Sequence, residues 1–208
     1  LVTKIIAPST DCVVPIGDQL LEKGLKKEIN AEFYTAVTRS PEVYRGNPFV
    51  IEAALAYGGD QSAEGTVTMY RFANRVPLLY QQSACAIYKA TLENNWRSYG
   101  LSQSANALPI GPVTVAVHMA SVWVPFTSES KEAIAHYPEI IKEIKLVLQE
   151  CGRRLYSYIS KKHRVGYELK KRGYIERYIP FVAEALKELL ELKDTEKRIV
   201  EQDLKEIL

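Results

Sequence analysis

Val113-Thr-Val-Ala-Val-His-Met-Ala-Ser-Val-Trp-Val124 is an apolar run, rich in β-branched side chains, that ends at Pro125. Its length and content predict a strand buried on both faces. A second such run is Phe49-Val-Ile-Glu-Ala-Ala-Leu-Ala-Tyr57, and residues 66–72 alternate between polar and apolar side chains as a strand does. The polar loop between these last two runs opens with Gly58-Gly59 and predicts that they form an antiparallel hairpin. The sequence therefore predicts a mostly antiparallel or mixed sheet.

Helical patterns flank these strands. Asp18 is a capable N-cap for a short helix over residues 19–29, and a second helix is expected over residues 83–94. Apolar residues recur at helical spacing from Tyr137 to Ile159, which predicts a long helix over about residues 139–164. Two more helical stretches are expected, over residues 180–192 and 195–208. The fold class is α/β (α+β), a sheet backed by helices with a long C-terminal helix and a helical extension.

Composition indicates an ordinary globular protein. Of its 208 residues 47% are apolar and 25% charged, the formal net charge is +2, and no apolar run is long enough for a membrane helix. Because the three cysteines are far apart along the chain, the sequence predicts neither a disulfide framework nor a zinc site. The chain opens at Leu1 without an initiating Met, so we expect a piece of a longer protein.

Catalytic and metal-binding motifs are absent from the sequence. There is no phosphate-binding G-x-x-x-x-G-K-[ST], no dinucleotide-binding G-x-G-x-x-G and no H-E-x-x-H. The histidines His118, His136 and His163 have no metal-ligand spacing, and no metal site is predicted. His118 lies inside the apolar strand, where we expect a hydrogen-bonded sheet residue.

Three cationic features remain, each with two interpretations. Thr127, Ser128 and Ser130 are possible N-caps, which places Lys131 in the first turn of a helix. Lys131 is either a surface lysine paired with Glu129 or Glu132 or a lysine presented to an anionic ligand. Trp96, Arg97 and Tyr99 suit a nucleic acid backbone, or a helix end in which Trp96 fills the core and Arg97 faces water. Residues 151–177 hold nine basic and two acidic side chains, 9 − 2 = +7, which is typical of either a DNA-contacting stretch or a solvated helix face.

Several segments together resemble the B subunit of type IIB DNA topoisomerases (topoisomerase VI) over roughly residues 5–165. They are Pro15-Ile-Gly17, Thr38-Arg39, Tyr44-Arg-Gly46-Asn-Pro-Phe49, Tyr57-Gly-Gly59, Arg71-Phe-Ala-Asn-Arg-Val-Pro-Leu-Leu-Tyr-Gln81, Trp96-Arg-Ser-Tyr-Gly-Leu101 and Val124-Pro-Phe-Thr-Ser-Glu-Ser-Lys-Glu-Ala-Ile-Ala135. The resemblance implies a transducer domain similar to the second domain of ribosomal protein S5. On this basis residues 1–40 lead into the transducer with a short helix, residues 41–165 form it up to the long helix, and residues 166–208 are a helical C-terminal extension.

The resemblance also implies a function. The transducer would couple ATP binding and hydrolysis to the DNA-cleaving A subunit of topoisomerase VI in ATP-dependent double-strand passage. Its expected partners are that A subunit, the N-terminal ATPase domain of the B subunit, a second B subunit and double-stranded DNA, with no membrane. ATP and Mg²⁺ would be bound mainly by the ATPase domain, since this chain has no N-x-x-D-A or D-x-G-x-G motif. The enzyme activity thus belongs to the holoenzyme, expected in the cytoplasm or nucleoid of an archaeon.

Two site assignments follow from the family's motifs. The switch lysine that contacts the γ-phosphate of ATP falls on Lys131, and the DNA-contacting W-K-x-Y motif falls on Trp96, Arg97 and Tyr99, with Arg in place of Lys. The alternative is a stand-alone S5-like nucleic-acid-binding module that uses Trp96, Arg97 and the basic run over residues 153–172. A scaffold whose helices bind a partner protein is a third interpretation.

Overall fold

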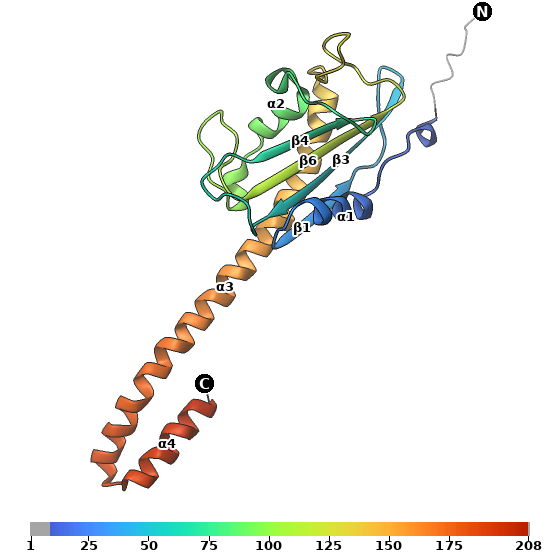
Figure 1. The fold of residues 1–208 in the computed structure, drawn as a ribbon. Helices are drawn as coiled ribbons and strands as arrows, with labels where there is room; N and C mark the ends of the chain where they lie inside the picture. Colours follow the sequence, from blue (N-terminus) through green and yellow to red (C-terminus); the bar gives the residue numbers. More distant parts are fainter. Residues whose placement is uncertain (1–8, 208) are drawn as a thin grey trace, which may run out of the picture. The chain divides into compact units, whose positions relative to one another are not determined.

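The computed structural model describes residues 9–207, which form two compact units with their boundary between Tyr158 and Ile159. The first unit holds the sheet and the second is helical (Figure 1). Residues 1–8, at the start of the segment expected to lead into the transducer, and residue 208 of the expected final helix lie outside the described residues. The division into residues 1–40, 41–165 and 166–208 stays a prediction.

The first unit is built on a six-stranded mixed sheet. The strand order is β1-β3-β6-β4-β5, and β2 pairs with β3. At its centre β3 and β6 run antiparallel, with Ala54 opposite Ala116. All nine residues of β6 are buried, which confirms the strand predicted from the apolar run. The strands are β1 (Phe33–Thr38), β2 (Glu42–Tyr44), β3 (Asn47–Tyr57), β4 (Thr68–Ala73), β5 (Val76–Pro77) and β6 (Val113–Ser121).

The predicted hairpin between residues 49–57 and 66–72 is wrong. Strand β6 lies between β3 and β4, and β4 pairs with β6 in parallel, with Thr68 opposite Thr114. Because both edges of β6 need a hydrogen-bonding partner in the buried interior, β3 takes one edge and β4 the other. Strand β4 forms a hairpin with β5, through the left-handed residues Asn74 (φ 47°) and Arg75 (φ 67°), as a two-residue turn requires.

Helices cover the two faces of the sheet (Figure 1). Helix α1 (Asp18–Glu28) lies on one face, where Leu25 packs on Ala36, Ala54 and Ala116. Its N-cap is Gly17 and not Asp18. The carboxylate of Asp18 accepts a hydrogen bond from the backbone amide of the next residue, Gln19. Helix α2 (Ala86–Glu93) follows β5 along the chain. Helix α3 covers the other face with a row of fully buried side chains, namely Ile140, Ile144, Val147, Leu148, Cys151 and Leu155.

Helix α3 is longer than predicted. It runs from Pro138 to Leu190, so the expected end near Arg164 and the separate helix over residues 180–192 are wrong. Pro180 lies inside it without ending it. The second unit is an α3–α4 pair, in which Lys187 of α3 contacts Asp194 of α4 at 2.6 Å and Lys197 pairs with Glu184. Helix α4 (Asp194–Ile207) agrees with the final helix predicted from the sequence.

A buried polar cluster links the N-terminal segment to the centre of the sheet. Glu52 on β3 is fully buried, and its carboxylate accepts bonds from the backbone amides of Ile16 (2.9 Å) and Gly17 (2.7 Å). Thr38 and His118 also bond it, at 2.9 and 2.8 Å. Because the Nε2 atom of His118 accepts the Arg75 amide, its Nδ1 atom carries the proton donated to Glu52. His118 is therefore a hydrogen-bonded sheet residue, as predicted from the sequence.

The ionisation of Glu52 ties folding to pH. Burial raises the pKa of Glu52, but the bonds from His118, Ile16, Gly17 and Thr38 outweigh it, so the net pKa lies below the ordinary value. A lowered carboxyl pKa gives stability that is complete above the unfolded-state pKa. That stability is lost as the pH falls through the lower folded-state pKa.

We therefore expect Glu52→Gln, which keeps the shape and removes the charge, to lower the free energy of unfolding by about 1.5–3 kcal/mol at pH 7. The gap from the unchanged chain should close in acid, below the ordinary glutamate pKa of about 4.3. Denaturant titrations at several pH values measure this gap. A gap that is independent of pH would contradict the assignment.

Candidate functional site

Lys131 lies in a loop, residues 125–135, whose two sides are joined by backbone hydrogen bonds. The Thr127 amide donates to the Ala133 carbonyl at 2.9 Å, and the Ala135 amide to Pro125 at 2.8 Å. Ala133 and Ile134 are fully buried, so they anchor the loop (residues 125–135) while Lys131 is exposed. The loop is thus a rigid support with a lysine near its tip.

The expectation that Lys131 lies in the first turn of a helix is wrong. Helix α3 begins only at Pro138, and Lys131 is left-handed, with φ 55°. Ser128 and Ser130 bond each other at 2.8 Å instead of capping a helix. Within residues 9–207, neither Glu129 nor Glu132 forms an ion pair with Lys131. The structure therefore does not contain the ion pair on which the interpretation of Lys131 as a paired surface lysine depended.

Trp96 and Arg97 lie in a short turn, η3 (Trp96–Tyr99), that follows α2. Trp96 is completely buried, and its indole Nε1 donates to the Thr91 carbonyl at 2.8 Å. Arg97 is exposed, and its Nε donates to the Gln103 carbonyl. This geometry agrees with the interpretation in which Trp96 fills the core and Arg97 faces water, and it leaves Arg97 the accessible cation of the motif.

Tyr99 rests against Gly152 of helix α3. A methyl group at Gly152 would lie 2.4 Å from the Cδ2 atom of Tyr99, well inside van der Waals contact. A glycine inside a helix costs about 1 kcal/mol relative to alanine, and here the close approach of the ring explains it. The ring also meets Trp96 edge-on, with centroids 6.2 Å apart. The turn is therefore fixed to the long helix as well as to α2.

Gln103 completes the support of this turn, and no sequence pattern pointed to it. Its Oε1 accepts the Trp96 amide at 3.0 Å, while its Nε2 donates to the carbonyls of Leu92 (3.2 Å) and Ala107 (3.0 Å). A single glutamine in a polar loop has no distinctive spacing, so only the tertiary structure identifies this role.

The two cationic positions lie at opposite ends of α2. The Ala86 amide, at the first residue of the helix, donates to the Ile134 carbonyl of the Lys131 loop at 2.8 Å. Beyond its last residue, Glu93, the chain turns into η3. At 1.5 Å per residue, α2 separates the two attachments by roughly 12 Å. The structure thus joins Lys131 and Arg97 to one short helix without bringing them together.

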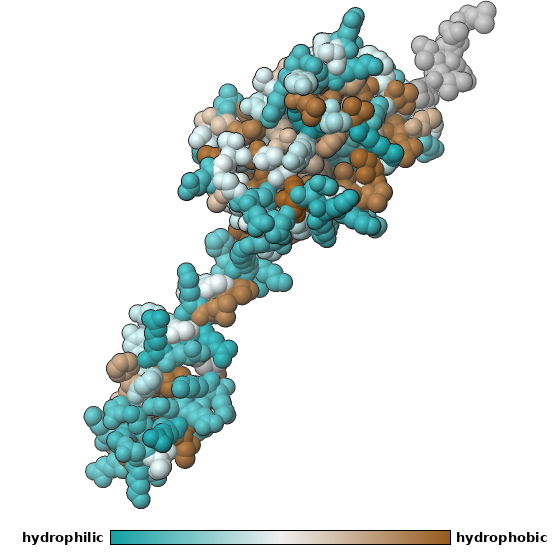
Figure 2. All heavy atoms as spheres, viewed as in Figure 1, coloured by the Kyte–Doolittle hydropathy of each residue, from teal (hydrophilic) through white to brown (hydrophobic). Residues whose placement is uncertain are grey.

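The basic stretch is partly used within the fold. Arg153 and Arg154 both pair with Glu150, at 2.5 and 3.2 Å, and Arg154 also donates to the Ala36 carbonyl at 3.0 Å. Among the later residues Arg172 pairs with Glu176 at 3.4 Å. Hydrophilic and hydrophobic side chains are interspersed on the face of the molecule that Figure 2 shows.

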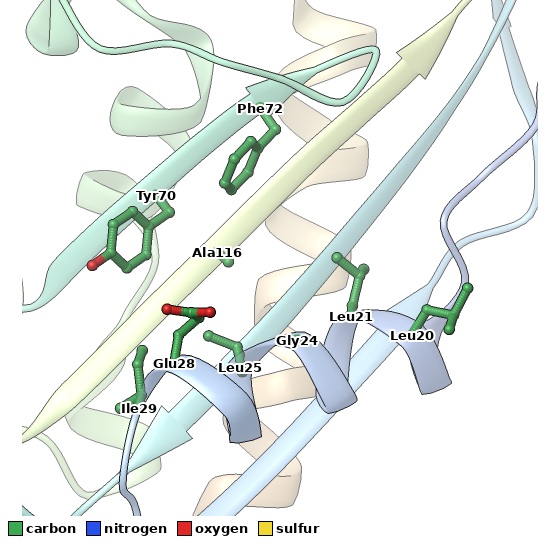
Figure 3. Close-up of a pocket in the computed structure, with 9 residues that line it drawn as sticks. All are labelled: Leu20, Leu21, Gly24, Leu25, Glu28, Ile29, Tyr70, Phe72 and Ala116. Carbon is green, nitrogen blue, oxygen red and sulfur yellow. The ribbon is translucent and has the colours of Figure 1, made fainter.

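An apolar groove of about 420 Å³ lies between α1 and β4, over the floor formed by Ala116 (Figure 3). Leu20 and Tyr70 on its rim are 63% and 47% exposed. The carboxylate of Glu28 is the one charged group that lines it. The phenol of Tyr70 is the other titratable group, and the rest of the lining is apolar.

The described residues contain no evident catalytic centre. Burial raises the pKa of the Cys151 thiol to about 12, so it is not a nucleophile. No group of three His, Cys, Asp or Glu side chains within residues 9–207 is arranged to hold a metal ion. Across the same residues, every helix is too short or too polar to cross a membrane. The exposed Lys131 and Arg97, each on a loop or turn that is hydrogen-bonded to its neighbours, instead define a module that presents cations from a packed frame of sheet and helices.

The family model described as "Topoisomerase VI B subunit, transducer" matches residues 8–171. The chain belongs to this family. Relatives named as the B subunit of type 2 DNA topoisomerase 6 include one from Natronomonas pharaonis, 45% identical over 98% of this chain and 26% of its own length. Another, from Archaeoglobus fulgidus, is 46% identical over 93% of this chain and 32% of its own. The chain thus spans about a quarter to a third of these archaeal relatives.

Solved structures show a weaker likeness. The 43K ATPase domain of Thermus thermophilus gyrase B, solved with an aminocoumarin, has a TM-score of 0.41 and 13% identity, over 84% of this chain and 46% of its own. The B-subunit of DNA gyrase from Myxococcus xanthus has a TM-score of 0.38 and 19% identity, over 58% and 34%. A likeness this weak supports no conclusion about this chain. The predicted mixed sheet backed by helices, with a long C-terminal helix, is confirmed by the strands and helices themselves.

The Tyr99 contact reverses the usual effect of replacing a helical glycine. Gly152→Ala should destabilise the chain by about 1–3 kcal/mol, because the methyl group overpacks the ring. The matched control is Gly173→Ala in the same helix, where nothing lies within 4 Å, and it should stabilise the helix by about 0.5–1 kcal/mol. Thermal unfolding followed by circular dichroism measures both.

A third variant isolates the contact. In a Tyr99→Ala background the ring is gone, so Gly152→Ala should become stabilising. If Gly152→Ala stabilises the chain that retains Tyr99, the contact has no energetic role.

Proposed function

We propose that this chain is the coupling part of the ATP-binding subunit of a type IIB DNA topoisomerase, and that Lys131 senses the terminal phosphate of ATP. The observation that carries the proposal is an exposed lysine without an ion-pair partner among the described residues, on a loop whose base is fully buried. Such a loop can reach into a site on another domain while transmitting force to the sheet behind it. Whole-enzyme activity, ATP-dependent double-strand passage, belongs to the assembled protein.

The fit to ATP concerns one contact. The described residues offer no acidic cluster for Mg²⁺, so ATP and Mg²⁺ would be held mainly by an ATPase domain outside this chain. Lys131 would add a charge-assisted bond to the γ-phosphate, worth about 1.5–3 kcal/mol. A contact made only with the triphosphate favours one position of the loop over another by that amount, which suffices to shift a two-state equilibrium.

Duplex DNA is the second proposed partner. Arg97 is the exposed cation of the Trp96–Tyr99 turn, and it would contact a backbone phosphate. Trp96 and Tyr99 would act by holding the turn, since Trp96 is completely buried and Tyr99 is seated on Gly152. This assigns the motif one contacting residue and two positioning residues.

The remaining partners follow from the proposed assembly. They are the DNA-cleaving A subunit of topoisomerase VI, the N-terminal ATPase domain of the B subunit and a second B subunit that joins when ATP binds. A cytoplasmic or nucleoid-associated location in an archaeon fits the archaeal sources of the relatives.

A second candidate function is a stand-alone nucleic-acid-binding module. The observation in its favour is the exposed Arg97 together with the basic stretch over residues 153–177, several of whose side chains are exposed. This candidate predicts salt-dependent DNA affinity for the 208-residue chain and no effect of Lys131 on any nucleotide-dependent step.

Lys131→Ala in the assembled enzyme should lower ATP turnover by at least tenfold and leave ATP affinity within about threefold, because only one of many nucleotide contacts is lost. Steady-state turnover and nucleotide titration measure the two quantities. The matched control is Lys142→Ala on α3, an exposed lysine for which the described residues show no ion pair, and it should turn over normally. Equal ATP turnover in the two variants would mean that Lys131 is a surface lysine without a role in sensing ATP.

A further inference from the structure

The apolar groove between α1 and β4 has a floor and two walls (Figure 3). In the parallel pairing of β4 with β6, Tyr70 lies opposite Ala116, and Phe72, two residues further on, faces the same side of the sheet. Helix α1 forms the other wall, with Leu25 packed on Ala116. Small-molecule sites have volumes of about 300–1,000 Å³ and mostly apolar linings. The groove, at about 420 Å³, is therefore large enough to hold a small organic molecule.

One carboxylate lines this groove without a partner. Glu28 is the last residue of α1, and its exposed side chain forms no hydrogen bond or ion pair with any residue of the described chain. A negative charge at this end of a helix opposes the helix dipole, unlike Lys26 and Lys27 in the same turn. Figure 3 shows the carboxylate extending from α1 into the groove. Neither helix stability nor ion pairing with the described residues therefore accounts for a carboxylate at this position.

The groove is polar at one end and apolar at the other. Figure 3 shows Glu28 and Tyr70 at one end, and Leu20 and Leu21 at the other. At 1.5 Å per residue, the step along α1 from Leu20 to Glu28 spans roughly 12 Å. Among the described residues that line the groove there is no Lys, Arg or His. An elongated molecule with a single charge at one end matches this arrangement.

The polar end of the groove favours a cation. A carboxylate attracts a positive charge, and the face of an aromatic ring attracts it through the ring quadrupole. The ring of Tyr70 is accessible, since the residue is 47% exposed. An anion in the same place is repelled by Glu28, which discriminates against molecules of the opposite charge.

We propose that this groove binds a small organic ammonium ion. Its ammonium group lies between the Glu28 carboxylate and the ring of Tyr70, and its apolar body extends along α1 towards Leu20. Neither the Lys131 loop nor the Arg97 turn lines the groove, so the inference is independent of the proposed function. A bound molecule contacts both α1 and β4, and it raises the melting temperature of the chain by mass action.

The test is a titration of the 208-residue chain with three probes of nearly the same shape, phenylbutylammonium, phenylbutanol and phenylbutyrate, monitored by the amide signals in NMR spectra. For a molecule of about a dozen non-hydrogen atoms, we expect the ammonium to bind with a Kd on the order of 1 mM. The alcohol should bind about fivefold more weakly, because contacts to an exposed charge are weak, and phenylbutyrate more weakly still. The amide signals of α1 and β4 should shift together.

Glu28→Gln removes the charge and keeps the shape of the side chain. It should bring the affinity for the ammonium to within about twofold of the affinity for the alcohol, and leave the binding of the alcohol unchanged. The matched control is Glu42→Gln on β2, an exposed carboxylate that does not line the groove. This control removes the same charge from the chain and should keep the preference for the ammonium.

Gly24 on α1 allows the groove itself to be filled. Nothing lies within 4 Å of the position that a Cβ atom would take there, so the first carbon of a side chain meets no neighbour. Gly24→Leu should occupy the groove and weaken the binding of the ammonium and the alcohol about tenfold. Gly24→Ala should weaken them less, and it should raise the melting temperature of the free chain because alanine favours a helix.

Equal affinity of the three probes, or a preference for the ammonium that survives Glu28→Gln, overturns the cation site. Shifts confined to other elements, together with unchanged binding in Gly24→Leu, overturn the groove as the place of binding.

The same titration on the assembled enzyme, observed through the NMR signals of the probes, should show the same preference for the ammonium. Loss of binding there would mean that another part of the assembly covers the groove, and it would assign the groove to a protein contact instead of a small ligand. Every probe result concerns this groove alone, so the proposed roles of Lys131 and Arg97 are tested separately.

Discussion

The antiparallel pairing of β3 with β6 is the interaction on which the rest of the structure depends. Both strands are buried on both faces, so every side chain along them must fit against a helix or a neighbouring strand. Alanines at Ala54 and Ala116 let helix α1 approach one face through Leu25, while the row of apolar side chains on α3 packs on the other. The one charge at the centre, Glu52, is satisfied by four hydrogen bonds, which tie the segment before α1 to the same two strands.

The proposed coupling would rest on how the two exposed cations, Lys131 and Arg97, are anchored. The Lys131 loop bonds the first residue of α2, and the Arg97 turn follows the last. Tyr99 seats that turn on Gly152, so it also contacts the long helix directly. A displacement of either cation is therefore passed to α2, and at the Arg97 turn to α3 as well, because packed elements move as rigid bodies instead of deforming.

The sequence pointed to the residues of the candidate site, but it did not show which of them are buried and which are exposed. The segments that contain Lys131 and Arg97 could be recognised from the sequence, because each places a cation beside turn-forming residues. The assignment of Lys131 to a helical turn failed because good N-cap residues also close tight loops, and here Ser128 and Ser130 bond each other. Trp96 gave no sign of being buried, since an aromatic residue beside an arginine fits both a stacking platform and a core plug. Gln103 carried no signal, because a glutamine in a polar loop has no distinctive spacing and its bonds to Trp96, Leu92 and Ala107 exist only once the loop is folded against the turn.

The sequence by itself determined the buried strands, the helical tail and the family, because apolar runs, helical periodicity and long local motifs are encoded within a few residues of one another. Only the tertiary structure decided the pairing of the strands. Residues 49–57 and 66–72 have the local pattern of a hairpin, yet β6 takes the place between them. A strand as apolar as β6 is most stable with both of its edges hydrogen-bonded and both of its faces covered, and no local pattern competes with that requirement.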